Sequence, residues 1–294
     1  MILERYLRAA SIEECTAHLA EYGDGAALLA GGTDLIPKMT QRRISVSTVI
    51  DLAHVPELCR IERDDCGVTV GAMHRLSALQ KENLFTGPMA ILPQCANHVS
   101  SMQIRNAATL GGNVCNASPA ADTVPGLLVL DAIALVQGKP GAREVPLESF
   151  FIGPGKTALE PEELLVGVRI PHAPPHSGTA YRKYAIRGDS DISLVGVGVK
   201  LTLDGGGRIA ETRIALASVG PTALRMTREE GMLAGAQPDV SLFKDVAEAC
   251  ADSCSPITDH RATKDYRKEM VRVWVEEALK AAFQHIVGSE GKEG

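Results

Sequence analysis

The chain has 294 residues, enough for about two domains of roughly 150 residues whose cores need neither disulfides nor metals. Its 30 basic and 36 acidic residues give a net charge of -6, and aromatic residues make up only 4%, so we expect neither an electrostatic funnel nor a stacking platform for nucleic acid. The longest apolar stretch, 127–136, is about half a membrane span, and charges stand near the start where a signal peptide needs an apolar run. These features predict a soluble cytoplasmic protein that does not enter the membrane.

Helix and strand patterns alternate in the first half of the chain. Ser11 followed by Glu14 is a capping-box signature and predicts a helix from Ile12 that stops at Gly23. The further expected elements are strands at 26–30 and 48–52, a hairpin at 61–72, helices around 74–82 and 89–99, a helix-like run at 122–130, and strands at 133–136, 144–147 and 164–170.

A proline-rich segment divides the chain. Residues 171–178 hold three prolines and a glycine, which excludes a central strand or helix there. We therefore expect one domain at 1–172 and a second at 178–286. The second domain shows strands at 179–186, 192–203 and 208–219, a hairpin turn at 204–207, and helices to the end, the last starting near Asp265. Strands followed by helices predict an α+β fold.

Several residue clusters that could hold a metal or phosphate fail on spacing. The seven cysteines are scattered with no C-x-x-C pair, so we interpret them as reduced thiols, with Cys250 and Cys254 facing the core. Two prolines between His172 and His176 prevent the helix that would aim both at one metal. The G-K-T ending at 155–157 lacks the first glycine of a P-loop, so 152–157 reads as a rigid loop. No metal site or catalytic set is predicted.

Two glycine pairs are the strongest candidates for ligand binding. They lie in Leu-Leu-Ala-Gly-Gly-Thr-Asp-Leu at 28–35 and in Thr-Leu-Gly-Gly-Asn at 109–113. Paired glycines let backbone N–H groups approach an anion with no Cβ in the way, and a diphosphate fits that description. The alternative is two tight turns with no ligand. A hydroxyl and a polar side chain beside each pair favour ligand binding.

These two motifs resemble parts of the flavin subunit of molybdenum hydroxylases of the xanthine dehydrogenase and aerobic carbon monoxide dehydrogenase type. The same resemblance is seen in Ala-Ser-Pro-Ala-Ala-Asp at 117–122, in Gly-Pro-Gly-Lys-Thr at 153–157, and in the stretches 103–113, 163–171 and 183–192. The resemblance spans nearly the whole chain. It implies an FAD-binding domain of the p-cresol methylhydroxylase type, built of two α+β subdomains. A small C-terminal α+β domain of the carbon monoxide dehydrogenase flavoprotein type would follow.

The resemblance also implies which residues bind FAD. The two glycine loops would hold the diphosphate, Asp122 would contact FAD hydroxyls, and Leu165 and Lys183 would lie at its adenine or flavin end. Val99 stands where relatives often carry an aromatic residue. The expected cofactor-binding residues are Leu28, Leu29, Ala30, Gly31, Gly32, Thr33, Asp34, Leu35, Val99, Thr109, Gly111, Gly112, Asn113, Asp122, Leu165 and Lys183.

By the same resemblance, the chain is an FAD-carrying electron-transfer subunit, most like that of xanthine dehydrogenase. Its partners would be a molybdenum-cofactor large subunit and a small subunit with [2Fe-2S] clusters, in a dimer of heterotrimers. The stretch 187–192 differs from that of NAD-using members, which leaves NAD or another acceptor open. The absence of cysteines between Cys115 and Cys250 predicts no iron-sulfur cluster on this chain. The alternatives are a self-contained flavin oxidoreductase of the same superfamily and a scaffold or ligand-binding module without turnover.

Overall fold

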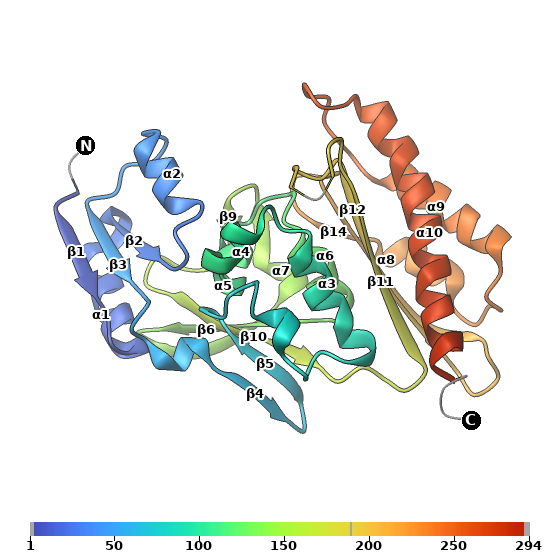
Figure 1. Cartoon of the computed structure of the whole chain (residues 1–294), viewed down its shortest axis with the longest axis horizontal. Coiled ribbons are helices and arrows are strands. Elements are labelled where there is room, and N and C mark those ends of the chain that lie inside the picture. Colours follow the sequence, from blue (N-terminus) through green and yellow to red (C-terminus); the bar gives the residue numbers. More distant parts are fainter. Residues whose placement is uncertain (1–2, 189, 291–294) are drawn as a thin grey trace.

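The first unit of the chain is a small parallel sheet with helical connections. The computed structural model describes residues 3–188 and 190–290. The strands β1 (Arg5–Arg8), β2 (Ala26–Leu29) and β3 (Thr48–Asp51) form a sheet in the order β1-β3-β2, and both pairings are parallel. Parallel strands need crossover connections, and α1 (Ile12–Tyr22) with η1 (Gly23–Gly25) and then α2 (Leu35–Thr40) lie in them. This unit occupies one end of the molecule, drawn in blue in Figure 1.

The second unit is an antiparallel sheet covered by short helices on one face (Figure 1). Its strands, in spatial order, are β4 (Ile61–Asp64), β5 (Gly67–Gly71), β10 (Leu164–Pro171), β6 (Ile133–Gly138) and β7 (Gly141–Pro146). The helices are α3 (Ile91–Asn97), α4 (Met102–Ala107), α5 (Leu110–Cys115), α6 (Thr123–Val129) and α7 (Leu147–Phe150). The turns η2 (Pro56–Cys59), η3 (Leu79–Lys81) and η4 (Gly87–Ala90) and the hairpin of β8 (Phe151–Gly153) and β9 (Lys156–Thr157) complete the unit.

The third unit is an antiparallel sheet between two helical layers. Its strands run β11 (Ser177–Tyr184), β12 (Val195–Leu203), β13 (Ile209–Ala217) and β14 (Leu224–Arg225), followed by α8 (Thr227–Glu230), η5 (Gly231–Leu233), α9 (Val240–Ser253) and α10 (Lys264–Glu290). The helix α10 packs on β11 and β12, while α6 of the second unit packs on β12 and β13. Both faces of the sheet are thus covered, so β12 is buried along nearly its whole length.

Gly198 lets the second and third units come into contact. A Cβ at this position of β12 would lie 2.8 Å from the Pro125 carbonyl oxygen in α6. Every residue of α6 is buried. The helix therefore belongs to the core of the second unit and also covers the sheet of the third.

The predicted α+β class is confirmed, and so are most local elements. Ser11 Oγ accepts a hydrogen bond from the Glu14 N–H at the start of α1, as its capping signature predicts. The helix expected at 74–82 is wrong: only η3 forms, because the His74 carbonyl and Leu76 N–H bond instead with the backbone of Leu110 and Ala108. The loop expected at 152–157 is part of the β8–β9 hairpin. The strand β1 was not predicted.

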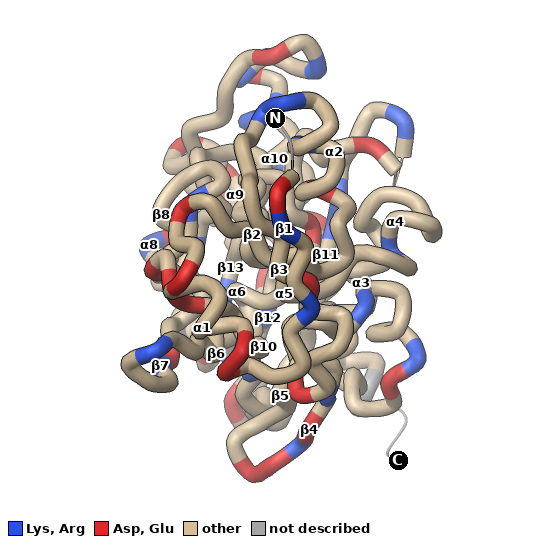
Figure 2. The backbone as a smooth tube through the Cα atoms, turned by 90° about the vertical axis from the view of Figure 1, so that its left-hand side faces the viewer, with Lys and Arg blue, Asp and Glu red and all other residues tan. Residues whose placement is uncertain are grey.

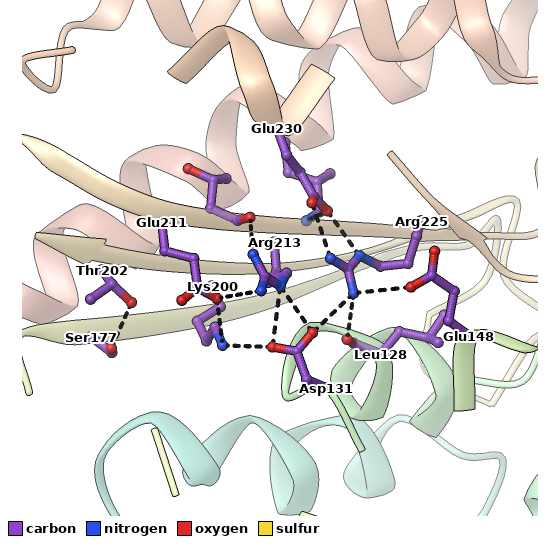
Figure 3. A network of polar contacts seen from close by, with 12 residues as sticks. Leu128, Asp131, Glu148, Ser177, Lys200, Thr202, Glu211, Arg213, Arg225 and Glu230 are labelled. Atoms are coloured by element: carbon purple, nitrogen blue, oxygen red, sulfur yellow. Dashed lines mark hydrogen bonds and ion pairs between the residues drawn. The ribbon is translucent and has the colours of Figure 1, made fainter. Parts of the chain in front are cut away.

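Asp131 ties the second unit to the third. It follows α6, has a φ of 53°, and lies among three cations from the opposite sheet, as Figure 3 shows. Its carboxylate is 2.9 Å from Arg213 Nε, 3.1 Å from Lys200 Nζ and 3.2 Å from Arg225 Nη1. Burial opposes ionisation of Asp131, but attraction to Lys200 and hydrogen bonds from Arg213 and Lys200 outweigh it, and its pKa lies below the ordinary 3.8.

We predict that Asp131→Asn destabilises the protein in a pH-dependent way. The side chain is 38% exposed, so the loss should fall between that of exposed and buried ion pairs, about 2 kcal/mol of unfolding free energy at pH 7. A lowered pKa stabilises the fold above the unfolded value of 3.8, and this contribution fades as the pH falls through the lower folded value. Urea titrations should therefore show the gap between variant and parent narrowing below about pH 4. Asp245→Asn, on the exposed face of α9, is the control; a gap that is constant with pH contradicts the assignment.

Candidate functional site

A pocket lies where the first unit meets the helices of the second. It has a volume of about 500 Å³, within the range of cofactor and small-molecule sites. Both predicted glycine loops form its walls. Its lining is Leu28, Ala30, Gly31, Gly32, Thr33, Asp34, Leu35, Lys38, Ile44, Val99, Ser100, Ile104, Ala108, Thr109, Gly112, Asn113, Cys115 and Asn116.

The first glycine loop, 31–34, joins β2 to α2 and lies directly on the second unit. A Cβ at Gly31 would stand 2.1 Å from the Ala107 carbonyl oxygen, so only glycine permits this approach. Gly32 has a φ of +72°, which glycine adopts without strain. Within the described part of the chain, the N–H groups of Gly32, Thr33 and Asp34 donate to no protein acceptor. This loop therefore presents bare backbone donors to the pocket.

The second glycine loop, 109–113, differs because its backbone donors are already used. Thr109 caps α5, with its Oγ1 accepting from the Gly112 N–H at 3.0 Å and its carbonyl accepting from the Asn113 N–H. The Gly111 N–H donates to the Ala72 carbonyl at 2.9 Å, and a Cβ at Gly111 would lie 2.5 Å from Ala72 Cβ. Gly111 thus seats α5 against the second unit, and Gly112 lines the pocket.

Polar side chains complete this wall. The Thr123 hydroxyl donates to Asn113 Oδ1 at 2.5 Å, which leaves the amide NH₂ of Asn113 as the group it can offer a ligand. Burial raises the pKa of the Cys115 thiol to about 12. That thiol stays protonated near neutral pH and is a poor nucleophile.

Lys38 is a functional candidate that sequence reasoning missed. It lies in α2 and reaches Asn116, at the end of α5, with Nζ 2.6 Å from Oδ1. Of the described carboxylates, none lies within ion-pair distance of its ammonium group. The only signal for Lys38 in the sequence is its position four residues after Asp34. This spacing places the two residues on one face of a helix, but it is informative only once a helix is known to start at Leu35. Figure 2 shows basic and acidic residues interspersed along the backbone on this side of the molecule.

The segment at Val99 and Ser100 forms another wall of the pocket. Ser100 has a φ of 48°, an uncommon conformation for a residue other than glycine. The Arg105 Nη1 donates to the Val99 carbonyl at 3.2 Å and to the Ser100 carbonyl at 2.8 Å.

Five of the expected cofactor-binding residues do not line this pocket: Leu29, Gly111, Asp122, Leu165 and Lys183. Leu165 is buried in the core of the second unit. Asp122 and Lys183 form a buried ion pair at 3.0 Å, and Tyr181 Oη donates to the same carboxylate at 2.8 Å. Burial raises the pKa of Asp122, although the Lys183 charge opposes this shift. Asp122 therefore balances the charge of Lys183, and their ion pair joins β11 to the second unit.

The structure also bears on the residues set aside from the sequence. Cys250 and Cys254 are buried in the core of the third unit. His172 and His176 are both exposed in the linker between β10 and β11. Among the residues that the structure describes, no cluster of His, Cys, Asp and Glu could hold a metal ion, and no helix is long and apolar enough to cross a membrane.

Two family models match the chain. Residues 3–173 match the FAD binding domain in molybdopterin dehydrogenase, and residues 179–282 match the CO dehydrogenase flavoprotein C-terminal domain. Among relatives, the 6-hydroxypseudooxynicotine dehydrogenase complex subunit alpha of Paenarthrobacter nicotinovorans is 30% identical, over 95% of this chain and 94% of its own. The xanthine dehydrogenase FAD-binding subunit of Escherichia coli O157:H7 is 30% identical over 94% and 95%.

A solved structure supports the same relationship. A chain of the carbon monoxide dehydrogenase from Hydrogenophaga pseudoflava superimposes with a TM-score of 0.92 at 32% identity, covering 97% of this chain and 99% of that one. The match thus extends over all three units and the pocket between the first two. The chain belongs to the family of FAD-binding subunits of molybdenum hydroxylases of the xanthine and carbon monoxide dehydrogenase type.

Proposed function

We propose that the chain is the electron-transfer subunit of a multisubunit molybdenum hydroxylase, most like xanthine dehydrogenase. It would take electrons from the [2Fe-2S] clusters of a small partner subunit and pass them to NAD or another acceptor. A large subunit with the molybdenum cofactor would carry out the hydroxylation, in a dimer of heterotrimers. The observation that carries this proposal is the pocket between the two glycine loops, within a chain matched almost end to end by FAD subunits.

The residues of the pocket fit FAD. The bare N–H groups of 32–34 and the ammonium of Lys38 are donors for a diphosphate, and the amide of Asn113 adds another on the opposite wall. A Cβ at Gly112 would stand 3.0 Å from Thr109 Oγ1 and 3.8 Å from Ala30 Cβ, so a side chain there would fill the space between the loops. We propose that the first loop binds the diphosphate directly, while the second shapes the wall.

The remaining expected residues would act near this pocket. We propose that Val99 bounds the space for the ligand, that Asp122 contacts FAD hydroxyls, and that Leu165 and Lys183 lie at its adenine or flavin end. When bound, FAD supplies two-electron redox chemistry, and the chain binds it, orients it and sets the charges around it. We assign no catalytic acid or base to this chain.

We also propose that the chain divides into domains at 1–172 and 178–286. The linker between β10 and β11 supports this division, as does an apolar cluster whose buried members all lie within 180–286. We also propose a cytoplasmic location, which is supported by seven cysteines that are all free thiols.

The isolated chain is predicted to carry FAD and neither iron nor molybdenum. It should show at most diaphorase-like activity, and hydroxylation should require both partner subunits. Flavin absorbance and elemental analysis of the purified chain check the first point, and reconstitution checks the second. Stoichiometric iron would overturn the assignment. Hydroxylation by the chain alone would favour a self-contained oxidoreductase, and a chain without flavin would favour a scaffold.

Gly31→Ala is expected to lose FAD because its Cβ would collide with the Ala107 carbonyl and push the two loops apart. Gly112→Val should also release FAD, here by filling the pocket. Bound flavin per chain should fall by at least about tenfold in each variant. Gly205→Ala is the control, since a Cβ there meets nothing within 4 Å. Full flavin occupancy in both pocket variants would remove the basis for the site.

Lys38→Met is expected to weaken FAD binding by about tenfold, the effect of losing one partly screened charge pair. Titration of the apoprotein with FAD at low and at high salt measures this. The parent should lose affinity as salt rises, and the variant should lose less. Lys244→Met, at an exposed position of α9, controls for a change in net charge. Equal salt dependence in parent and variant would show that Lys38 does not meet the diphosphate.

A further inference from the structure

Two consecutive residues in one wall of the pocket, and the residue just before them, have their backbone carbonyls held by cationic side chains. Lys183 Nζ donates to the His98 carbonyl at 2.8 Å. Arg105 Nη1 donates to the carbonyls of Val99 and Ser100 at 3.2 and 2.8 Å. We call residues 98–100 the wall turn. Since Val99 and Ser100 line the pocket, the positions of these carbonyls set its shape.

The wall turn has a conformation that its sequence does not favour. Ser100 has a φ of 48°, and a serine lacks the freedom that glycine has in this region. Such a conformation persists only where surrounding contacts hold it, and it is typical of ligand-binding segments. Here the contacts are charge-assisted hydrogen bonds, which are stronger than those between neutral groups.

Arg105 is directed at this turn. It lies in α4, four residues after the capping residue Ser101, so the helix that begins just after the turn carries the cation back onto it. Both side-chain hydrogen bonds of Arg105 go to the wall turn, and its Nε is buried without a partner in the described part of the chain. Leaving a buried donor such as this Nε unused is costly. The hydrogen bonds of Arg105 are therefore directed at holding the backbone of the wall turn.

The other cation reaches the wall turn from the third unit. Lys183 lies in β11, its side chain is only 2% exposed, and Asp122 balances its charge. Next to this contact, the His98 ring lies 5.5 Å from the Tyr181 ring. The wall turn is thus held by Arg105, which precedes the linker between β10 and β11, and by Lys183, which follows it.

We propose that Arg105 is a positioning residue for FAD: by holding the Val99 and Ser100 carbonyls, it keeps Ser100 in its left-handed conformation, while Lys183 anchors the His98 carbonyl. This inference rests on the proposed FAD site. It assigns to Arg105 an effect on the cofactor through the backbone, without contact between its guanidinium and FAD. It also makes the third unit a support of the flavin pocket.

The test uses the full chain, stripped of flavin and titrated with FAD. Arg105→Met should weaken FAD binding by about tenfold or more and change the visible circular dichroism of the bound flavin. The melting temperature of the apoprotein should change little. Arg105→Lys, which keeps the charge but loses the planar fork, should give an intermediate affinity. Gln103→Met, at an exposed position of the same helix, should behave like the parent.

A double-mutant cycle with Ser100→Gly tests the route through the backbone. Glycine adopts positive φ without strain, so Arg105→Met should cost several-fold less affinity in the Ser100→Gly background than in the parent. Equal losses in the two backgrounds would overturn the proposal. So would parent-like affinity in Arg105→Met, or an affinity loss matched by an equal loss of apoprotein stability. Should the parent chain itself bind no FAD, the proposed function fails instead, and Arg105 has only a structural role.

Discussion

The backbone contact between Gly31 and the Ala107 carbonyl decides whether a pocket exists at all. The two loops come from different units, one at the end of a parallel strand and the other at the N-terminus of the short helix α5. A single methyl group at Gly31 would fall 2.1 Å from a carbonyl oxygen that cannot move alone, because Ala108 also bonds to Leu76. Sheet, helices and loops can each form without this contact. Without it, however, the two loops would not lie side by side as a binding site.

The two loops differ in how many free backbone N–H donors they offer to a ligand. In the second loop, helix α5 uses the N–H groups of Gly111, Gly112 and Asn113 for its own capping and seating. In the first loop, the N–H groups of 32–34 remain available. Sequence alone makes both loops look like equivalent glycine pairs. Three-dimensional contacts separate a loop that offers donors from one that provides a rigid wall.

Local signals in the sequence were sufficient wherever structure depends on near neighbours. The capped helix α1, the hairpin of β4 and β5, and the final helix follow from capping, alternation and periodicity. The segment at 74–82 was mispredicted because its backbone bonds with residues 108–110, which no local pattern reveals. The same holds for Lys38 and Arg105. Their significance comes from Asn116 and from a strained turn, and no residue-type signature marks either contact.

The double coverage of β12 has a consequence for how the molecule opens. With α6 on one face and α10 on the other, its amide groups cannot reach solvent unless one helical layer leaves the sheet. Hydrogen exchange along β12 should thus report the departure of either α6 or α10 from the sheet. A proteolytic fragment ending at the linker would expose the whole apolar side of α6 and tend to aggregate. The linker divides the chain in sequence, yet α6 and β12 pack against each other across it.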